Sequence, residues 1–194
     1  MSGVFRHVDG ATPLTWEEMQ DVIPVHIAYR RDLDEAEQAN ILRGQDWALG
    51  RRRAILDEKF IRTLHKRMFG DVWRWAGRFR TSARNIGIDH WLIPVALRQA
   101  LEDCEAWLEF DSYPMDEIAV RLHHKLVWIH PFPNGNGRHA RLVADLLMMQ
   151  AGRERFSWGR ATLREAGDVR ERYIGALRRA DGFDMAPLVA FARS

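Results

Sequence analysis

The chain has 194 residues, of which 46% are hydrophobic, and its 29 basic and 27 acidic side chains give a net charge of +2. This length suits one globular domain with a large core, and the near-balance of charge argues against direct nucleic-acid binding. The single cysteine, Cys104, excludes an internal disulfide and a cysteine metal cluster, as is typical of cytoplasmic proteins. Residues 1–14 lack a signal-peptide core, and no apolar run approaches the ~18 residues of a membrane span.

The N-terminal part of the chain predicts helices after an extended leader. Thr15 and Glu18 form a capping box, which indicates a short helix over 16–22. Apolar residues at helical spacing predict two longer helices, over 32–50 and 53–68, and Gly70 ends the second.

The helical pattern breaks between residues 75 and 94. Residues 77–81 and 86–93 read as two short strands, which predict a β-hairpin. Further helices are expected over 94–110, 114–129, 136–150, 161–181 and 185–193. We therefore expect a mainly α fold, a helical bundle with one short β-hairpin.

The most informative segment joins two of these helices and reads His130-Pro131-Phe132-Pro133-Asn134-Gly135-Asn136-Gly137-Arg138-His139-Ala140-Arg141. A glycine-rich loop at a helix start leaves backbone N–H groups available for phosphate, where the helix dipole is positive. Arg138 and Arg141 are three residues apart, so on a helix both can reach one anion. His130, with an ordinary pKa of about 6.5, is suited to accept a proton from a hydroxyl at the mouth of this site.

The segment has two other interpretations. Histidines at 123, 124, 130 and 139 suggest a metal site, but no His-Glu-x-x-His pattern is present. The glycines alone could be a tight helix–helix connection, which would leave the histidine and the two arginines unexplained. The spacing fits neither a Walker loop nor a Rossmann fingerprint.

The segment resembles the Fic family motif His-Pro-Phe-x-(Asp/Glu)-Gly-Asn-Gly-Arg-x-x-Arg and departs from it only at Asn134. Leu64-His65, residues 69–80 and residues 173–181 are similar to other parts of the family's domain. Residues 33–41 resemble the group called mobile mystery protein B. The resemblance implies a helical Fic core over 53–194, preceded by an N-terminal extension over 1–52.

The resemblance also implies roles for the motif residues. His130 matches the family's general base, and Phe132 matches a buried aromatic that anchors the loop. The remaining matched positions are the phosphate-binding ones, Gly135, Asn136, Gly137, Arg138 and Arg141. Glycine permits close backbone approach to phosphate, and the side chain or backbone of Asn136 can donate to an oxygen.

Three further expectations come from the family. Asn134 stands at the acidic position that holds Mg²⁺, so we expect weaker metal binding there. Ile88 and Trp91 lie in the hairpin, about 79–93, which resembles the flap that docks a target segment. The helix from Leu33 to Gly50 has two interpretations: an inhibitory helix whose Glu37 or Glu35 reaches Arg141, or an ordinary solvated helical face. The family's inhibitory Ser/Thr-x-x-x-Glu-Gly/Asn pattern is absent from it.

The resemblance implies a cytoplasmic protein adenylyltransferase of bacterial type, which moves AMP from ATP to a Ser, Thr or Tyr hydroxyl of a target protein. One alternative is a Doc-like kinase that transfers the γ-phosphate. Another is a nucleotide-sensing or partner-binding module with little catalysis. An antitoxin-like or DNA-binding protein is a candidate regulator, whereas neither a membrane nor direct nucleic-acid binding is expected.

Overall fold

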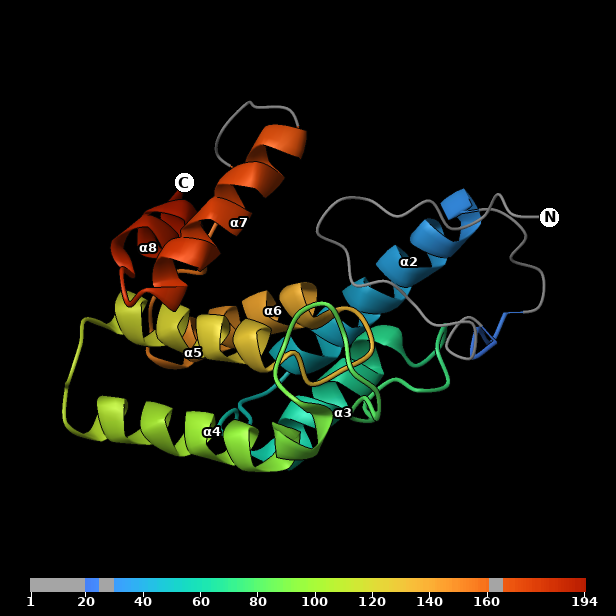
Figure 1. Cartoon of the computed structure of the whole chain (residues 1–194), viewed down its shortest axis with the longest axis horizontal. Helices are drawn as coiled ribbons and strands as arrows, with labels where there is room; N and C mark the ends of the chain where they lie inside the picture. Colours follow the sequence, from blue (N-terminus) through green and yellow to red (C-terminus); the bar gives the residue numbers. More distant parts are fainter. Residues whose placement is uncertain (1–19, 25–29, 161–165) are drawn as a thin grey trace.

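The computed structural model describes residues 20–24, 30–160 and 166–194, and most of them are helical, as predicted (Figure 1). The helices are α2 (Arg30–Leu49), α3 (Glu58–Phe69), the 3₁₀ turn η1 (His90–Leu92), α4 (Ile93–Glu109), α5 (Met115–Ile129), α6 (Asn136–Gln150), α7 (Ala166–Asp181) and α8 (Ala186–Arg193).

Helices α4, α5 and α6 pack side by side, with α7 and α8 against one side of this layer (Figure 1). The core between them is apolar and includes Leu97, Leu122, Leu126, Val143 and Met148, none more than 1% exposed. The connection between α5 and α6 is therefore held between two helices that are buried along one face.

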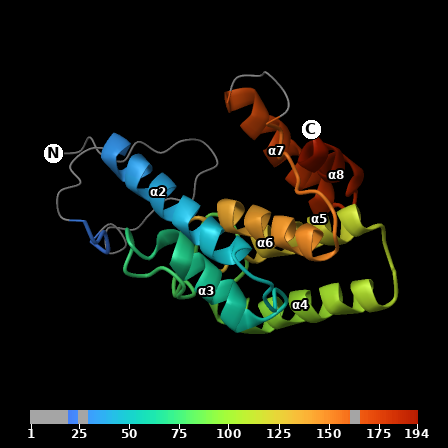
Figure 2. The ribbon, with the colours of Figure 1, turned by 180° about the vertical axis from the view of Figure 1, so that it is seen from behind.

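Helix α2 lies along α3 and also reaches α6 (Figure 2). Gly44 permits the close approach, because a Cβ there would lie 2.8 Å from the Met68 backbone. The Asn40 amide, 1% exposed, donates to the Arg67 carbonyl and accepts from the Asp71 N–H at 2.9 and 2.8 Å. The N-terminal part of the chain is thereby attached to the C-terminal end of α3 and to the turn that follows it.

The helix boundaries follow local capping signals. Helix α3 begins at Glu58 rather than near 53, because the Asp57 carboxylate caps it by accepting from the Phe60 N–H at 3.0 Å. Most of the helix predicted over 16–22 lies outside the described residues. Its last part is a turn, and Val22 forms an isolated antiparallel bridge with Trp73.

The predicted hairpin over 79–93 is wrong: among these residues, all of them described, there is a loop followed by η1 and the start of α4. The reason is a side chain. The Arg80 guanidinium donates to the carbonyls of Ser82 and Ile88, which takes the acceptors that a second strand would need. The loop is closed by one buried arginine instead of by a strand ladder.

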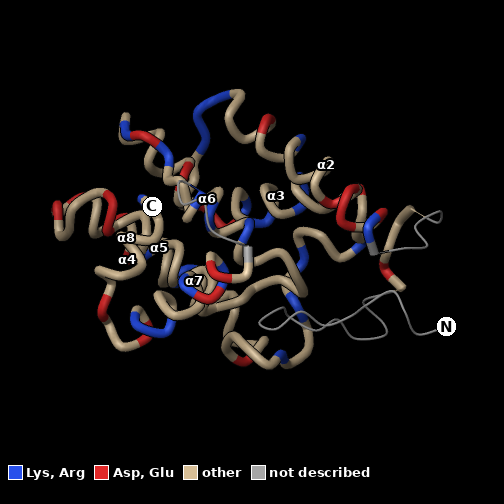
Figure 3. Tube along the Cα trace, turned by 90° about the horizontal axis from the view of Figure 1, so that it is seen from above, with Lys and Arg blue, Asp and Glu red and all other residues tan. Residues whose placement is uncertain are grey.

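Acidic and basic positions are interspersed along the trace in Figure 3. In the part of the chain that the structure describes, no helix has the length and hydrophobicity to cross a membrane. The division into an N-terminal extension over 1–52 and a core over 53–194 stays a prediction.

Candidate active site

The segment 130–135 is a sharp connection between α5 and α6. His130 caps α5 in the left-handed conformation, with φ 53°, and Gly135 precedes α6 in the same region, with φ 77°. The Asn136 side chain, 3% exposed, closes the turn: it accepts from the Phe132 N–H at 2.9 Å and donates to the Phe132 carbonyl at 2.8 Å. Histidine and the start of α6 are therefore held in a fixed relation.

Aromatic side chains from α3 support this loop from below. A Cβ on Gly135 would lie 2.5 Å from the Phe69 ring, so only glycine fits there. Phe132 is fully buried and stacks on His65 with a centroid distance of 3.7 Å. His65 Nδ1 accepts from the Gly77 N–H at 3.0 Å, which leaves Nε2–H to donate to the Asn134 carbonyl at 3.0 Å.

His130 is buried, at 5% exposure, and not open at the mouth of a cleft as the sequence predicted. Burial lowers its pKa to about 4, a hydrogen bond with the Val127 backbone raises it, and the Arg80 and Arg84 charges lower it further. The imidazole is neutral at physiological pH, as a general base must be. Its covering is the loop 81–88, because a Cβ on Gly87 would lie 2.5 Å from His130 Cβ.

The first turn of α6 provides donors for an anion. The backbone N–H groups at a helix start lack intrahelical acceptors. Here Gly135 stands just before these groups and Gly137 stands among them. The Asn136 side chain is used inside the loop, so the donor that remains from Asn136 for an anion is its backbone N–H.

The two arginines of the motif have different surroundings. The Arg141 guanidinium lies over the Tyr173 ring at 5.4 Å from its centroid, and burial lowers the pKa of Arg141. The Tyr173 hydroxyl bonds to His123 Nε2 at 3.0 Å and lies 3.7 Å from where a Cβ on Gly137 would be. Arg138 lies over the Phe69 ring at 5.0 Å.

One of the two predicted inhibitory glutamates reaches this site. Glu37, 6% exposed, accepts from Arg138 Nη1 at 2.7 Å and from the Trp73 indole N–H at 2.7 Å. Its partner is Arg138 and not Arg141, because α2 crosses beside the first turn of α6. Glu35 lies on the exposed face of α2, 3.7 Å from Arg31.

Asn134 forms a poor metal site by itself. Its amide oxygen accepts from the Gly135 N–H at 2.7 Å, and an amide carries no formal charge. Among the residues that the structure describes, no three His, Cys, Asp or Glu side chains gather where they could hold a metal ion. Magnesium at this loop would therefore depend on ligands that the protein does not supply, such as nucleotide phosphates and water.

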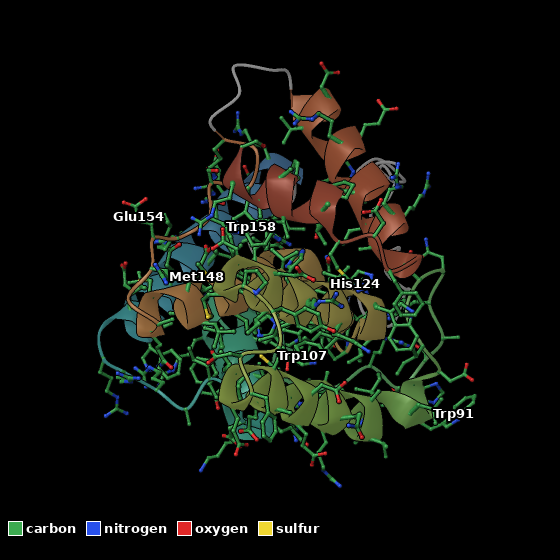
Figure 4. All side chains as sticks on the ribbon, turned by 90° about the vertical axis from the view of Figure 1, so that its left-hand side faces the viewer. Trp91, Trp107, His124, Met148, Glu154 and Trp158 are labelled. Atoms are coloured by element: carbon green, nitrogen blue, oxygen red, sulfur yellow. The ribbon has the colours of Figure 1, made fainter. Side chains whose placement is uncertain are left out.

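The two residues predicted to dock a target have opposite orientations. Ile88 packs partly buried against a small cluster that contains Ile93 and Ile129. Trp91 is 65% exposed and lies at the outer end of α4, away from the core (Figure 4). Of the pair, only Trp91 is free to contact another chain.

Sequence reasoning missed three residues that shape the site: His65, Arg80 and Tyr173. Each lies far along the chain from the motif, and each contacts it through a tertiary approach that spacing does not reveal. The available signal for all three was the family resemblance, which also covers Leu64-His65, residues 69–80 and residues 173–181.

Residues 55–148 match the Fic/DOC family. Protein adenylyltransferase fic-1 of Caenorhabditis elegans is 37% identical over 97 residues, which are 47% of this chain and 19% of that protein. Protein adenylyltransferase Fic of Drosophila grimshawi is 31% identical over 156 residues, 75% of this chain and 32% of that protein. This chain thus spans less than a third of the length of either relative.

A similar architecture occurs in BepC, a VirB-translocated effector protein of Bartonella tribocorum. The TM-score is 0.68 at 15% sequence identity, over 92% of this chain and 97% of that one. This likeness concerns the fold.

Proposed function

This chain belongs to the Fic/DOC family, and we propose that it is a protein adenylyltransferase that transfers AMP from ATP to a Ser, Thr or Tyr hydroxyl of a target protein. The observation that carries the proposal is the junction between α5 and α6. There a neutral imidazole, His130, is joined by one rigid turn to a glycine-flanked helix start that bears two arginines. The names of the Caenorhabditis and Drosophila relatives support the same reaction.

In the proposed reaction the target hydroxyl oxygen forms a bond to the α-phosphorus of ATP, and the bond from that phosphorus to pyrophosphate breaks. His130 accepts the hydroxyl proton. One ring nitrogen is engaged by the Val127 backbone, so the other is the proton acceptor. The backbone of His130 is fixed because this residue caps the helix α5, and a general base must be held within hydrogen-bond reach of the proton that it accepts.

The nucleotide's triphosphate is assigned to the start of α6. Backbone N–H groups of Asn136 and Gly137 approach the phosphates closely, Gly135 leaves room for that approach, and Arg138 and Arg141 neutralise the phosphate charge. The Gly135 N–H itself donates to the Asn134 side chain. BepC, whose fold is similar, has been crystallised with AMPPNP bound. Mg²⁺ would come with the nucleotide, because Asn134 offers the metal a single neutral oxygen.

Target docking is assigned to the loop 79–93 through Trp91, whose exposed ring can pack on a peptide. Ile88 supports the loop from inside instead. A cytoplasmic setting suits the buried free thiol of Cys104, whose pKa burial raises to about 12. An antitoxin-like or DNA-binding regulator remains a prediction of the resemblance alone.

The experiment that tests the proposal uses ATP labelled at either the α- or the γ-phosphate, with lysate as the source of targets. We expect the α-label to appear on protein and pyrophosphate to be released, and His130→Ala to abolish labelling. Arg78→Met is a matched control, because the Arg78 side chain is exposed and outside the loop.

Two rivals give different results in the same experiment. Transfer of the γ-label with ADP release would assign the chain to Doc-like kinase chemistry. ATP binding without label on any protein would favour a nucleotide-sensing module. The Glu37–Arg138 pair and the covered His130 would then explain the lack of transfer.

A further inference from the structure

Arg80 connects the end of α5 to the loop that covers His130. Its side chain is buried, and the residue is 3% exposed. Arg80 Nε donates to the His130 carbonyl at 2.7 Å, and Nη2 approaches the Ile129 carbonyl at 3.4 Å. On the loop side, Nη1 donates to the Ser82 carbonyl at 2.9 Å and Nη2 donates to Ile88.

The carbonyls that Arg80 binds at the end of α5 are ones that the helix itself leaves without donor partners. The last C=O groups of a helix have no intrahelical donor, and His130 is left-handed, so its own carbonyl points away from the helix ladder. A cation there also complements the negative end of the helix dipole. The Arg80 backbone N–H adds a bond to the Pro131 carbonyl at 2.9 Å.

The same guanidinium holds the cover in place. The loop 81–88 begins and ends at carbonyls that Arg80 binds, and Gly87 lies directly on His130. Gly87 has φ 94°, and a Cβ there would come within 2.5 Å of His130 Cβ and 2.9 Å of Arg80 Nη2. A target hydroxyl cannot reach the imidazole unless this loop moves.

We propose that Arg80 is a positioning residue, which fixes the backbone of His130 for proton transfer and holds the loop 81–88 closed over the imidazole until a target arrives. This inference rests on the proposed function. Opening the cover breaks the bonds to Ser82 and Ile88, while the bonds to Ile129, His130 and Pro131 stay, so the base keeps its place as the site opens. Lysine cannot substitute, because one ammonium lacks the planar set of donors that reaches both segments.

The kinetic test compares Arg80→Met and Arg80→Lys with Arg78→Met as the matched control. We expect kcat for AMP transfer to fall about 100-fold in Arg80→Met, as when a base is displaced by about 1 Å. KM for ATP stays close to that of the wild type, because the start of α6 is intact. Guanidinium chloride, well below denaturing concentration, restores part of the rate, whereas sodium chloride at equal ionic strength does not. An unchanged kcat, or an equal loss in Arg78→Met, overturns the assignment.

The second test does not depend on transfer activity. Modification of His130 by diethyl pyrocarbonate is followed by peptide mass spectrometry, with the other histidines as internal references and thermal unfolding as the check of folding. We expect slow modification in the wild type and faster modification in Arg80→Met and Arg80→Lys. Gly87→Ala, which keeps the arginine but whose Cβ crowds both His130 and Arg80 Nη2 and so lifts the cover, also accelerates it.

The two tests separate the inference from the proposed function. If the wild type has no transfer activity but His130 modification still accelerates in the Arg80 variants, the adenylyltransferase proposal is wrong and the positioning role of Arg80 is kept. Equal rates of His130 modification in all variants would show that Arg80 does not hold the loop 81–88 closed, whatever the activity of the wild type. If the Arg80 variants do not fold, Gly87→Ala alone decides whether the loop is the cover.

Discussion

The contact between Glu37 and Arg138 predicts that this protein restrains its own phosphate site. Glu37 is almost fully buried and accepts from Arg138 Nη1 at 2.7 Å. A nucleotide phosphate that uses Arg138 must first replace this carboxylate. We therefore expect Glu37→Gln to bind ATP more tightly and to transfer more label than the wild type.

The magnitude follows from the geometry. A hydrogen bond to a charged group contributes about 1.5–3 kcal/mol, so its release corresponds to roughly a 10- to 100-fold tighter apparent Kd for ATP. Glutamine is the informative replacement, because its amide oxygen can still accept from the Trp73 indole, which now bonds to Glu37 at 2.7 Å. The packing of α2 is kept while the competing charge is removed.

Calorimetric titration with AMPPNP and a self-modification assay measure the two effects, with thermal unfolding as the check of folding. Glu35→Gln is the matched control, because Glu35 is on the same helix but exposed, 3.7 Å from Arg31. An unchanged Kd and an unchanged rate in Glu37→Gln would refute the reasoning. An equal gain in Glu35→Gln would show that helix charge, and not the pair with Arg138, is responsible.

Three further outcomes are expected. Asn134→Asp should lower the Mg²⁺ concentration that gives the half-maximal rate, because a carboxylate adds a charged ligand; an unchanged Mg²⁺ dependence would place residue 134 away from the metal. Gly135→Ala should cost at least ~1–3 kcal/mol of stability in urea unfolding and reduce ATP binding, since its Cβ would lie 2.5 Å from the Phe69 ring, whereas wild-type values would show that the ring gives way. Burial lowers the pKa of His123 to about 3 and that of His139 to about 4. As the pH drops below 6.5 both histidines are protonated in the unfolded chain before they are in the folded one, so the free energy of unfolding falls, by about 2 kcal/mol for each at pH 5. Equal unfolding midpoints at pH 7 and pH 5 would contradict this.

The helices of this fold were predictable because their signals are local. Pro94 and Pro114 stand at or before the first turns of α4 and α5, and the glycine loop ends where α6 begins, at Asn136. Each signal acts within about one helical turn, so no knowledge of the fold was needed. The backbone N–H groups at the start of α6, on which the proposed phosphate binding depends, were predictable for the same reason, since they belong to the start of one helix.

The cover over His130 was not predictable from local pattern. Residues 77–81 and 86–93 have strand-like composition, yet the acceptors of the loop are taken by Arg80, which no pairing rule anticipates. The burial of His130, and with it the low pKa, depends on that tertiary contact. Likewise, spacing showed that Glu37 is on a helix, but the crossing of α2 beside α6 decided that it meets Arg138 and not Arg141.

If the proposed reaction takes place at this site, segments outside the motif restrain both of its substrates. On the base side, the loop 81–88 lies on His130 and is held by Arg80. On the phosphate side, α2 supplies Glu37 to Arg138. The two restraints share no residue and act on different substrates, because one blocks the hydroxyl and the other competes with the nucleotide. A target alone would lift the first restraint and leave the second, so we expect full transfer activity only when the target and the nucleotide each displace their own restraint.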